Sequence, residues 1–229
     1  MPLPGGPWVS RPFYFFWICI CSGSMSERKM QSLNAAIRES IPMMKWAKKT
    51  SSIDDLMVGV IEFSSGTRWR NTQPIPVEDF TWTDLKADSS TTDKGKAFSK
   101  VAEQLNVMLI PERILSPVLV LVTDGQPTDD YRSGLKQIMS LPWGEKAVRI
   151  AIGIGEDCDF CVLEEFVGNS EIKPLRARNE ESLTRYIKWA STVLIKNVAI
   201  APSLPVDFSK FRYTNILQIP TPSAEPEVW

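Results

Sequence analysis

The sequence predicts an α/β domain with a doubly wound, mostly parallel central sheet flanked by helices. Short apolar runs alternate along the chain with longer segments whose apolar residues recur at helical spacing. The run VLVLV at Val118–Val122 has no polar alternation, which is typical of a strand buried on both faces of a parallel sheet. Strands that alternate with helices favour parallel pairing through right-handed crossovers.

The first half of the chain opens with the apolar run Phe13–Cys21. This run resembles a short signal peptide, but its aromatic and β-branched residues favour a buried strand, and nine residues are too few to span a bilayer, which takes about 20. We therefore interpret it as a strand. The other elements expected here are a helix from Glu27 to about Lys48 that Pro42 should kink or split, a strand at Leu56–Phe63, a short edge strand within 64–80 and a helix at Lys94–Leu105.

The second half continues the alternation after the Val118–Val122 strand, which we place centrally in the sheet. The expected elements are a helix at Asp130–Met139 with Thr128 or Asp129 as N-cap, a strand at Val148–Ile154, a short helix at Cys158–Val167, a short strand near Ile172–Leu175 and a long helix at Glu180–Val198.

We expect one folded domain over residues 13–199. Residues 1–12 are rich in Pro and Gly and are interpreted as an N-terminal arm. Residues 200–229 are Pro-rich and lack periodicity, which indicates a loosely packed tail. The alternative is a docking peptide that anchors in a partner through aromatic residues such as Trp229.

Composition excludes several classes of function. With 26 basic and 27 acidic residues the net charge is −1, so the broad positive field that nucleic acid requires is absent. The sequence has no histidine, which excludes Ser-His-Asp and Cys-His catalysis and histidine metal ligands. The four cysteines form two close pairs rather than a disulfide framework, which predicts a reducing, cytoplasmic location. We expect neither an enzyme nor a membrane partner.

Three loops at the expected carboxyl edge of the sheet carry oxygen atoms suited to a metal ion. The first follows Phe13–Cys21 and offers Ser22, Ser24 and Ser26; the segment before the Lys94 helix offers Thr91, Thr92 and Asp93; the loop after Val118–Val122 offers Thr123 and Asp124. Ligands of open α/β sheets bind at this edge. Hydroxyls and a carboxylate suit a hard cation such as Mg²⁺.

These three motifs, Ser22-Gly23-Ser24-Met25, Thr92-Asp93-Lys94-Gly95 and Thr123-Asp124-Gly125, together resemble the metal-ion-dependent adhesion site of the von Willebrand factor A (vWA) domain. The resemblance covers roughly residues 12–198. The stretches RPFYFFW and VLVLVTDGQPTDD are similar to small bacterial vWA proteins of the tellurium-resistance type, which accompany kinase-like and phosphatase-like partners. The resemblance implies a metal site formed by Ser22, Ser24, Thr92 and Asp124.

One position departs from the family pattern Asp-x-Ser-x-Ser, because Ile20 stands where the first aspartate is expected. In the family that carboxylate holds a metal-bound water, and losing such a partner typically weakens metal binding about 10–100-fold. We therefore predict a weakened Mg²⁺ site, which Asp93 would partly restore if its carboxylate faced the ion. The alternative roles are structural: Ser22 and Ser24 cap the next helix, and Asp124 closes a turn with Gly125. Glu27, Arg28 and Lys29 are expected to form a solvated helix start.

Two hypotheses for function follow. The first is a non-enzymatic module that binds a partner protein through the carboxyl-edge loops, and the resemblance implies a kinase- or phosphatase-like partner. The second is a thiol redox or metal-sensing protein that uses Cys158 and Cys161, where a helix N-terminus would lower a thiol pKa. In a variant of this second hypothesis, both cysteine pairs bind one Zn²⁺ ion. The alternative is that all four cysteines are structural.

Overall fold

The computed structural model describes residues 12–87, 92–107, 115–200, 220 and 229. Its strands are β1 (Pro12–Ile20), β2 (Asp55–Phe63), β3 (Thr67–Trp69), β4 (Ile75–Pro76), β5 (Val118–Thr123), β6 (Val148–Ile154) and β7 (Leu175–Ala177). They form one sheet in the order β3-β2-β1-β5-β6-β7, and β4 also pairs with β2. All pairs are parallel except those of β3 and β4 with β2. The predicted mostly parallel sheet and the central place of β5 are confirmed.

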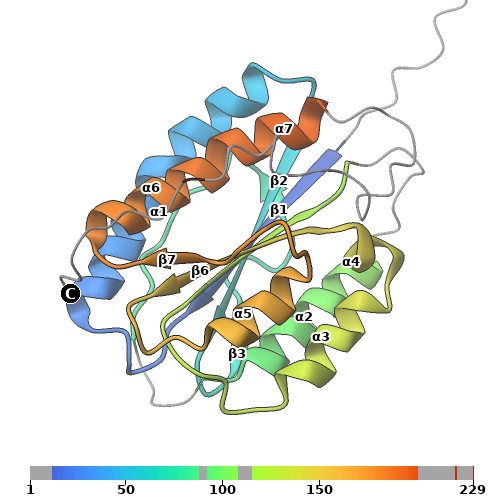
Figure 1. Ribbon diagram of the computed structural model, residues 1–229. Helices are drawn as coiled ribbons and strands as arrows, with labels where there is room; N and C mark the ends of the chain where they lie inside the picture. Colours follow the sequence, from blue (N-terminus) through green and yellow to red (C-terminus); the bar gives the residue numbers. More distant parts are fainter. Residues whose placement is uncertain (1–11, 88–91, 108–114, 201–219, 221–228) are drawn as a thin grey trace, which may run out of the picture.

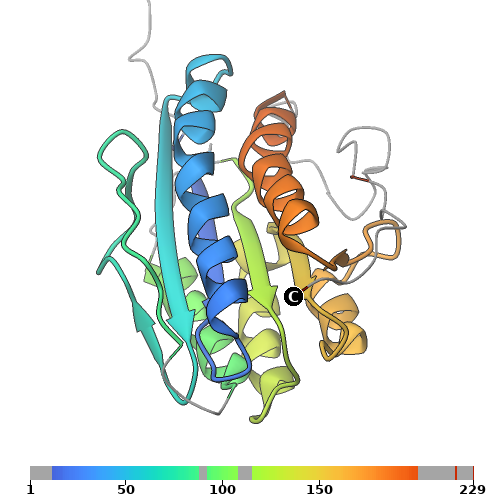
Figure 2. The same cartoon turned by 90° about the vertical axis from the view of Figure 1, so that its left-hand side faces the viewer.

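Helices cover both faces of the sheet (Figure 1). They are α1 (Glu27–Lys49), α2 (Lys94–Val107), α3 (Tyr131–Met139), α4 (Pro142–Lys146), α5 (Phe160–Val167), α6 (Glu180–Trp189), the π-helical turn η1 (Ala190–Leu194) and α7 (Ile195–Ile200). One layer holds α1, α6 and α7, which Figure 2 shows side by side in front of the sheet. The other layer holds α2 to α5, in which α2 packs against α3. The doubly wound architecture that the sequence predicts is confirmed.

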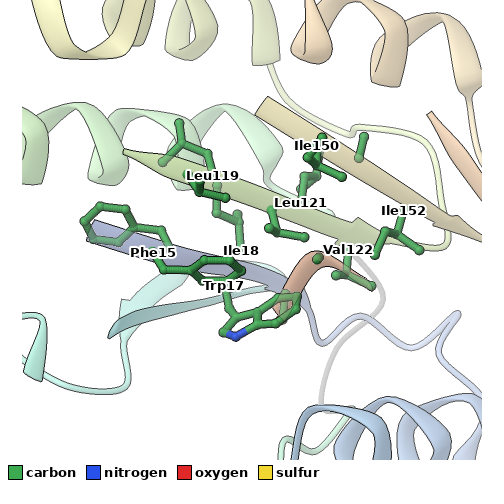
Figure 3. Close-up of a cluster of buried hydrophobic side chains, with 14 of the residues drawn as sticks. Phe15, Trp17, Ile18, Leu119, Leu121, Val122, Ile150 and Ile152 are labelled. Atoms are coloured by element: carbon green, nitrogen blue, oxygen red, sulfur yellow. The ribbon is translucent and has the colours of Figure 1, made fainter. Parts of the chain in front are cut away.

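The core is built around β1, which lies between β2 and β5. Phe15 is in register with Val58 on one side and Val118 on the other, and from Phe15 to Ile20 every β1 residue is fully buried. Figure 3 shows the β1 side chains beside those of β5 and β6: Phe15, Trp17, Ile18, Leu119, Leu121, Val122, Ile150 and Ile152. The interpretation of the first apolar run as a buried strand is confirmed, with its end at Ile20 rather than Cys21.

Two of the expected helices differ in detail. Helix α1 runs unbroken past Pro42, so the expected split is wrong; Pro42 lies on the exposed side of the helix. The helix expected at Glu180–Val198 is interrupted by η1. There the hydroxyls of Ser191 and Thr192 donate to the carbonyls of Ile187 and Lys188, and such back-bonding competes with the regular helical ladder.

Two further expectations are corrected. Helix α3 starts at Tyr131, and its N-cap is Asp130, whose carboxylate accepts from the Ser133 amide, rather than Thr128 or Asp129. The short strand expected near Ile172–Leu175 is β7, which begins only at Leu175 after Pro174. Ile172 is buried in the preceding loop, so its apolar character reflects burial rather than a strand.

Most of the predicted arm and tail lies outside the described residues. Trp229 is described, and it packs against the hydrophobic core of this chain. Within the described ranges, no helix combines the length and the apolar character needed to cross a membrane.

Candidate functional site

The carboxyl ends of β1, β2, β5, β6 and β7 share one edge of the sheet, and the predicted site residues meet there. The Ser22 and Ser24 hydroxyl oxygens lie 2.7 Å apart, and the Ser24 hydroxyl donates to Asp124 Oδ1 at 2.8 Å. Ser22, Thr92 and Asp124 are buried, whereas Ser24 is exposed. The loops after β1 and β5 are therefore joined through one hydroxyl–carboxylate bond at the rim of the sheet.

Thr92 completes this cluster from the third loop. A methyl group placed on Gly125 would lie 3.7 Å from Ser24 Oγ and 3.9 Å from Thr92 Oγ1, so both hydroxyls face the same glycine. Backbone contacts fix Thr92 in place: its amide donates to Thr128 Oγ1 at 2.9 Å, and its carbonyl accepts from the Thr128 amide at 3.0 Å. The structure thus brings together all four predicted residues.

The loop after β5 also caps α2, which packs beside it but does not follow it in the sequence. The Asp129 carboxylate accepts from the Gly95 amide at 2.8 Å and from the Lys96 amide at 3.0 Å, at the start of α2. These amides have no partner within their own helix, so a carboxylate is a favourable cap. Thr128 and Asp129 therefore hold the loop of Asp124 against the segment of Thr92, a role that the sequence analysis missed.

The structural alternatives for the serines and Asp93 are resolved. The N-cap of α1 is Ser26, whose hydroxyl accepts from the Lys29 amide at 3.3 Å, so Ser22 and Ser24 are not the cap. Asp93 Oδ2 is paired with Lys96 Nζ at 2.6 Å, and Asp93 Oδ1 accepts from Thr128 Oγ1 at 3.4 Å. The Asp93 carboxylate is therefore engaged elsewhere and does not replace the missing aspartate.

Two lysines that the sequence analysis did not assign to the site lie beside Asp124. Lys29 Nζ is 3.8 Å from Asp124 Oδ2, and its side chain is only 13% exposed, so the expected solvated role of Lys29 is wrong. Lys94 is fully buried and donates to the carbonyl of Gly125. Both lysines lie in the first turn of a helix, where a cation opposes the helix dipole, and that position was the signal available in the sequence.

The electrostatics of the site follow from this burial. Burial raises the pKa of the Asp124 carboxyl above its usual value, while the Ser24 hydrogen bond and the Lys29 charge act in the opposite direction. Burial lowers the pKa of the Lys94 ammonium to about 8. Asp124 Oδ2 has no hydrogen-bond partner among the described residues.

The four oxygen donors resemble a Mg²⁺ site in kind, but the charge around them does not fit one. Ser22, Ser24, Thr92 and Asp124 would be the ligands. Among these four described residues only Asp124 has a carboxylate, and that carboxylate already forms an ion pair with Lys29. Hard cations in proteins are usually balanced by carboxylates. Ile20 is fully buried in the core at the position of the missing acid. The described residues contain no group of three or more Cys, Asp or Glu side chains placed to hold a metal.

The cysteines do not form a common site. All four are free; Cys19, Cys21 and Cys158 are buried, and Cys161 is exposed. Burial raises the pKa of the Cys158 thiol to about 11, which is opposite to the lowering expected at a helix N-terminus. Asp159, not a thiol, caps α5. This geometry supports the structural interpretation of the cysteines.

The overall fold is similar to that of solved vWA proteins. A von Willebrand factor type A protein from Catenulispora acidiphila matches with a TM-score of 0.59 and 16% identity, over 81% of this chain and 43% of that one. The ArnB paralog VWA2 from Sulfolobus acidocaldarius matches with a TM-score of 0.56 and 19% identity, over 79% of this chain and 45% of that one. Proximal thread matrix protein 1 from the mussel byssus, solved with zinc in its metal-ion-dependent adhesion site (MIDAS) motif, matches with a TM-score of 0.55 and 14% identity. The match covers 81% of this chain and 46% of that one.

This chain therefore spans less than half the length of each of these three proteins. No protein-family model matches the sequence, and no curated protein sequence matches it. Structural similarity at this level of identity establishes the fold, and the fold is that of a vWA domain.

Proposed function

We propose that this chain is a non-enzymatic interaction module that binds a partner protein through the carboxyl-edge loops of its vWA fold. The observation that carries the proposal is the convergence of Ser22, Ser24, Thr92 and Asp124 at the edge where open α/β sheets bind their ligands. Ser24 is exposed at this edge, so a partner can reach the cluster.

The proposal of a non-enzymatic role is supported by the chemistry of the same residues. The hydroxyls of Ser22 and Ser24 contact each other, and Ser24 donates to Asp124. The sequence has no histidine to activate a serine nucleophile. These hydroxyls are better placed to bind than to react.

The finer parts of the proposal rest on the sequence alone. The four cysteines, which do not form a disulfide framework, favour a cytoplasmic location. Similarity to small bacterial vWA proteins of the tellurium-resistance type favours a kinase-like or phosphatase-like partner. The Mg²⁺ bridge that the resemblance implies is not part of the mechanism we propose, because the charge at the site does not fit it.

Site-specific photocrosslinking tests which edge of the sheet binds. A photoreactive amino acid is placed at Gln126, exposed in the loop after β5, and in a matched variant at Ser140, exposed at the opposite edge after α3. In cells that express the full chain, the Gln126 variant is expected to give a defined crosslinked protein that the Ser140 variant does not give, with or without EDTA. Equal crosslinking from both positions, or none from Gln126, contradicts the proposal.

A further inference from the structure

The ion pair between Lys29 and Asp124 lies at the centre of the candidate site. Lys29 Nζ is 3.8 Å from Asp124 Oδ2, with the two side chains 13% and 0% exposed. Surface ion pairs are screened by water, but this one is largely removed from it. The other carboxylate oxygen, Oδ1, accepts the Ser24 hydrogen bond. Lys29 therefore approaches Asp124 at the oxygen that the serine leaves unpaired.

The surroundings add positive rather than negative charge. Helices α1 and α2 both begin at this edge, and each helix N-terminus carries a partial positive charge. Lys94, the first residue of α2, is buried, and its charge also acts on Asp124. Asp93 is paired with Lys96, and Ile20 contributes no charge. Two ammonium groups, those of Lys29 and Lys94, act on the Asp124 carboxylate, and the Asp129 and Asp159 carboxylates also act on Lys94.

Lys29 is not placed there for the stability of its own helix. Ser26 already caps α1, and a lysine in the first turn faces the unfavourable end of the helix dipole. Glu27, two residues earlier in the same turn, has the charge that favours this end of the helix. The position of Lys29 is better explained by its contact with Asp124 than by helix formation.

We infer that the ammonium group of Lys29 is a resident cation at Asp124 and takes over the charge-compensating role that a divalent ion has in a metal-dependent adhesion site. The hydroxyl cluster is then held together without metal, and a divalent ion at Asp124 is opposed by Lys29. Binding of a partner at this edge then needs no divalent ion, so it is not sensitive to chelators.

Mg²⁺ titration by isothermal calorimetry tests the inference on the full chain at low salt. The wild type is compared with Lys29→Met, which removes the charge and keeps an unbranched side chain, and with Lys29→Arg, which keeps the charge. The wild type and Lys29→Arg are expected to show no saturable binding at millimolar Mg²⁺. Lys29→Met is expected to show saturable binding in this range, because a group beside a metal site typically changes the affinity about 10–100-fold.

The double variant Lys29→Met/Asp124→Asn locates any binding that appears, and it is expected to lose the binding gained in Lys29→Met. Two results overturn the inference: wild-type Mg²⁺ binding that Asp124→Asn abolishes, or no gain in folded Lys29→Met. If Lys29→Met does not fold, the wild type and Asp124→Asn alone decide, because Asp124-dependent binding in the wild type overturns the inference and its absence supports it. The inference concerns the edge assigned to partner binding, but the titration needs no partner, so it can fail while the proposed function stands.

Discussion

Ile20 ends β1 at the position where the family pattern places an aspartate, and its side chain belongs to the hydrophobic core. It is fully buried and in register with Phe63 of β2. Two residues further on, Ser22 is still buried but is polar and contacts Ser24. The boundary between core and site therefore falls within these three residues, and residue 20 lies on the core side.

Replacing Ile20 with Asp is expected to lower the free energy of unfolding by more than about 3 kcal/mol, because it buries a carboxylate in an apolar environment. Ile20→Val, which keeps an apolar side chain, is expected to lose about 1 kcal/mol. Urea unfolding followed by circular dichroism measures both. If Ile20→Asp is as stable as Ile20→Val, residue 20 tolerates a charge and our assignment of it to the core is wrong.

At the scale of elements, α2 and α3 approach each other through two glycines. A methyl group on Gly95 would lie 2.5 Å from the Asp130 carbonyl oxygen, and one on Gly134 would lie 2.3 Å from the Gly95 carbonyl oxygen. This close contact holds the loop of Asp124, between β5 and α3, against the start of α2. The packing of two helices thus sets the geometry of the candidate site.

Gly134→Ala is expected to destabilise the chain by about 2–3 kcal/mol, because the new methyl group meets backbone atoms that cannot move without separating α2 from α3. Gly66→Ala in the β2–β3 connection is the matched control, since a methyl group there meets no atom within 4 Å. Thermal unfolding of both variants measures the difference. Similar melting temperatures for the two would show that the α2–α3 contact is not tight.

The sequence was sufficient to predict the main strands and helices, since these depend on local patterns, but not α4 or η1, and the four-residue cluster was predicted from its resemblance to vWA motifs. Apolar runs identified the strands, and Ser22, Thr92 and Asp124 each follow or precede an element whose place in the sheet was predictable. Lys29, Lys94 and Asp129 were missed because their roles depend on contacts between elements. Asp129 caps α2, not the helix that follows it in sequence, and Lys29 pairs with a carboxylate 95 positions away.

At the scale of the whole molecule, buried ionisable groups link stability to pH with opposing signs. Burial lowers the pKa of Lys94 from 10.5 to about 8, so between these values the unfolded chain binds more protons and Lys94 makes stability rise with pH. Burial raises the pKa of the Cys158 and Cys19 thiols, so unfolded thiols lose their protons first and these groups make stability fall with pH above about 8. These contributions partly cancel in the total, so Lys94 must be examined by difference.

The wild type is compared with Lys94→Met at each pH, both in a Cys158→Ala background because the Lys94 charge acts on that thiol, so that the remaining thiol contributions are shared. The free energy of unfolding of the wild type minus that of Lys94→Met is expected to increase by about 1 kcal/mol from pH 8 to pH 9, as the buried ammonium loses its proton before the unfolded one does. Urea unfolding in the presence of a reductant measures it, with Lys100→Met, an exposed-side lysine of the same helix, as control. A difference that is constant over this range would mean that Lys94 titrates as it does in the unfolded chain, and that its charge is not held in the dry environment that burial implies.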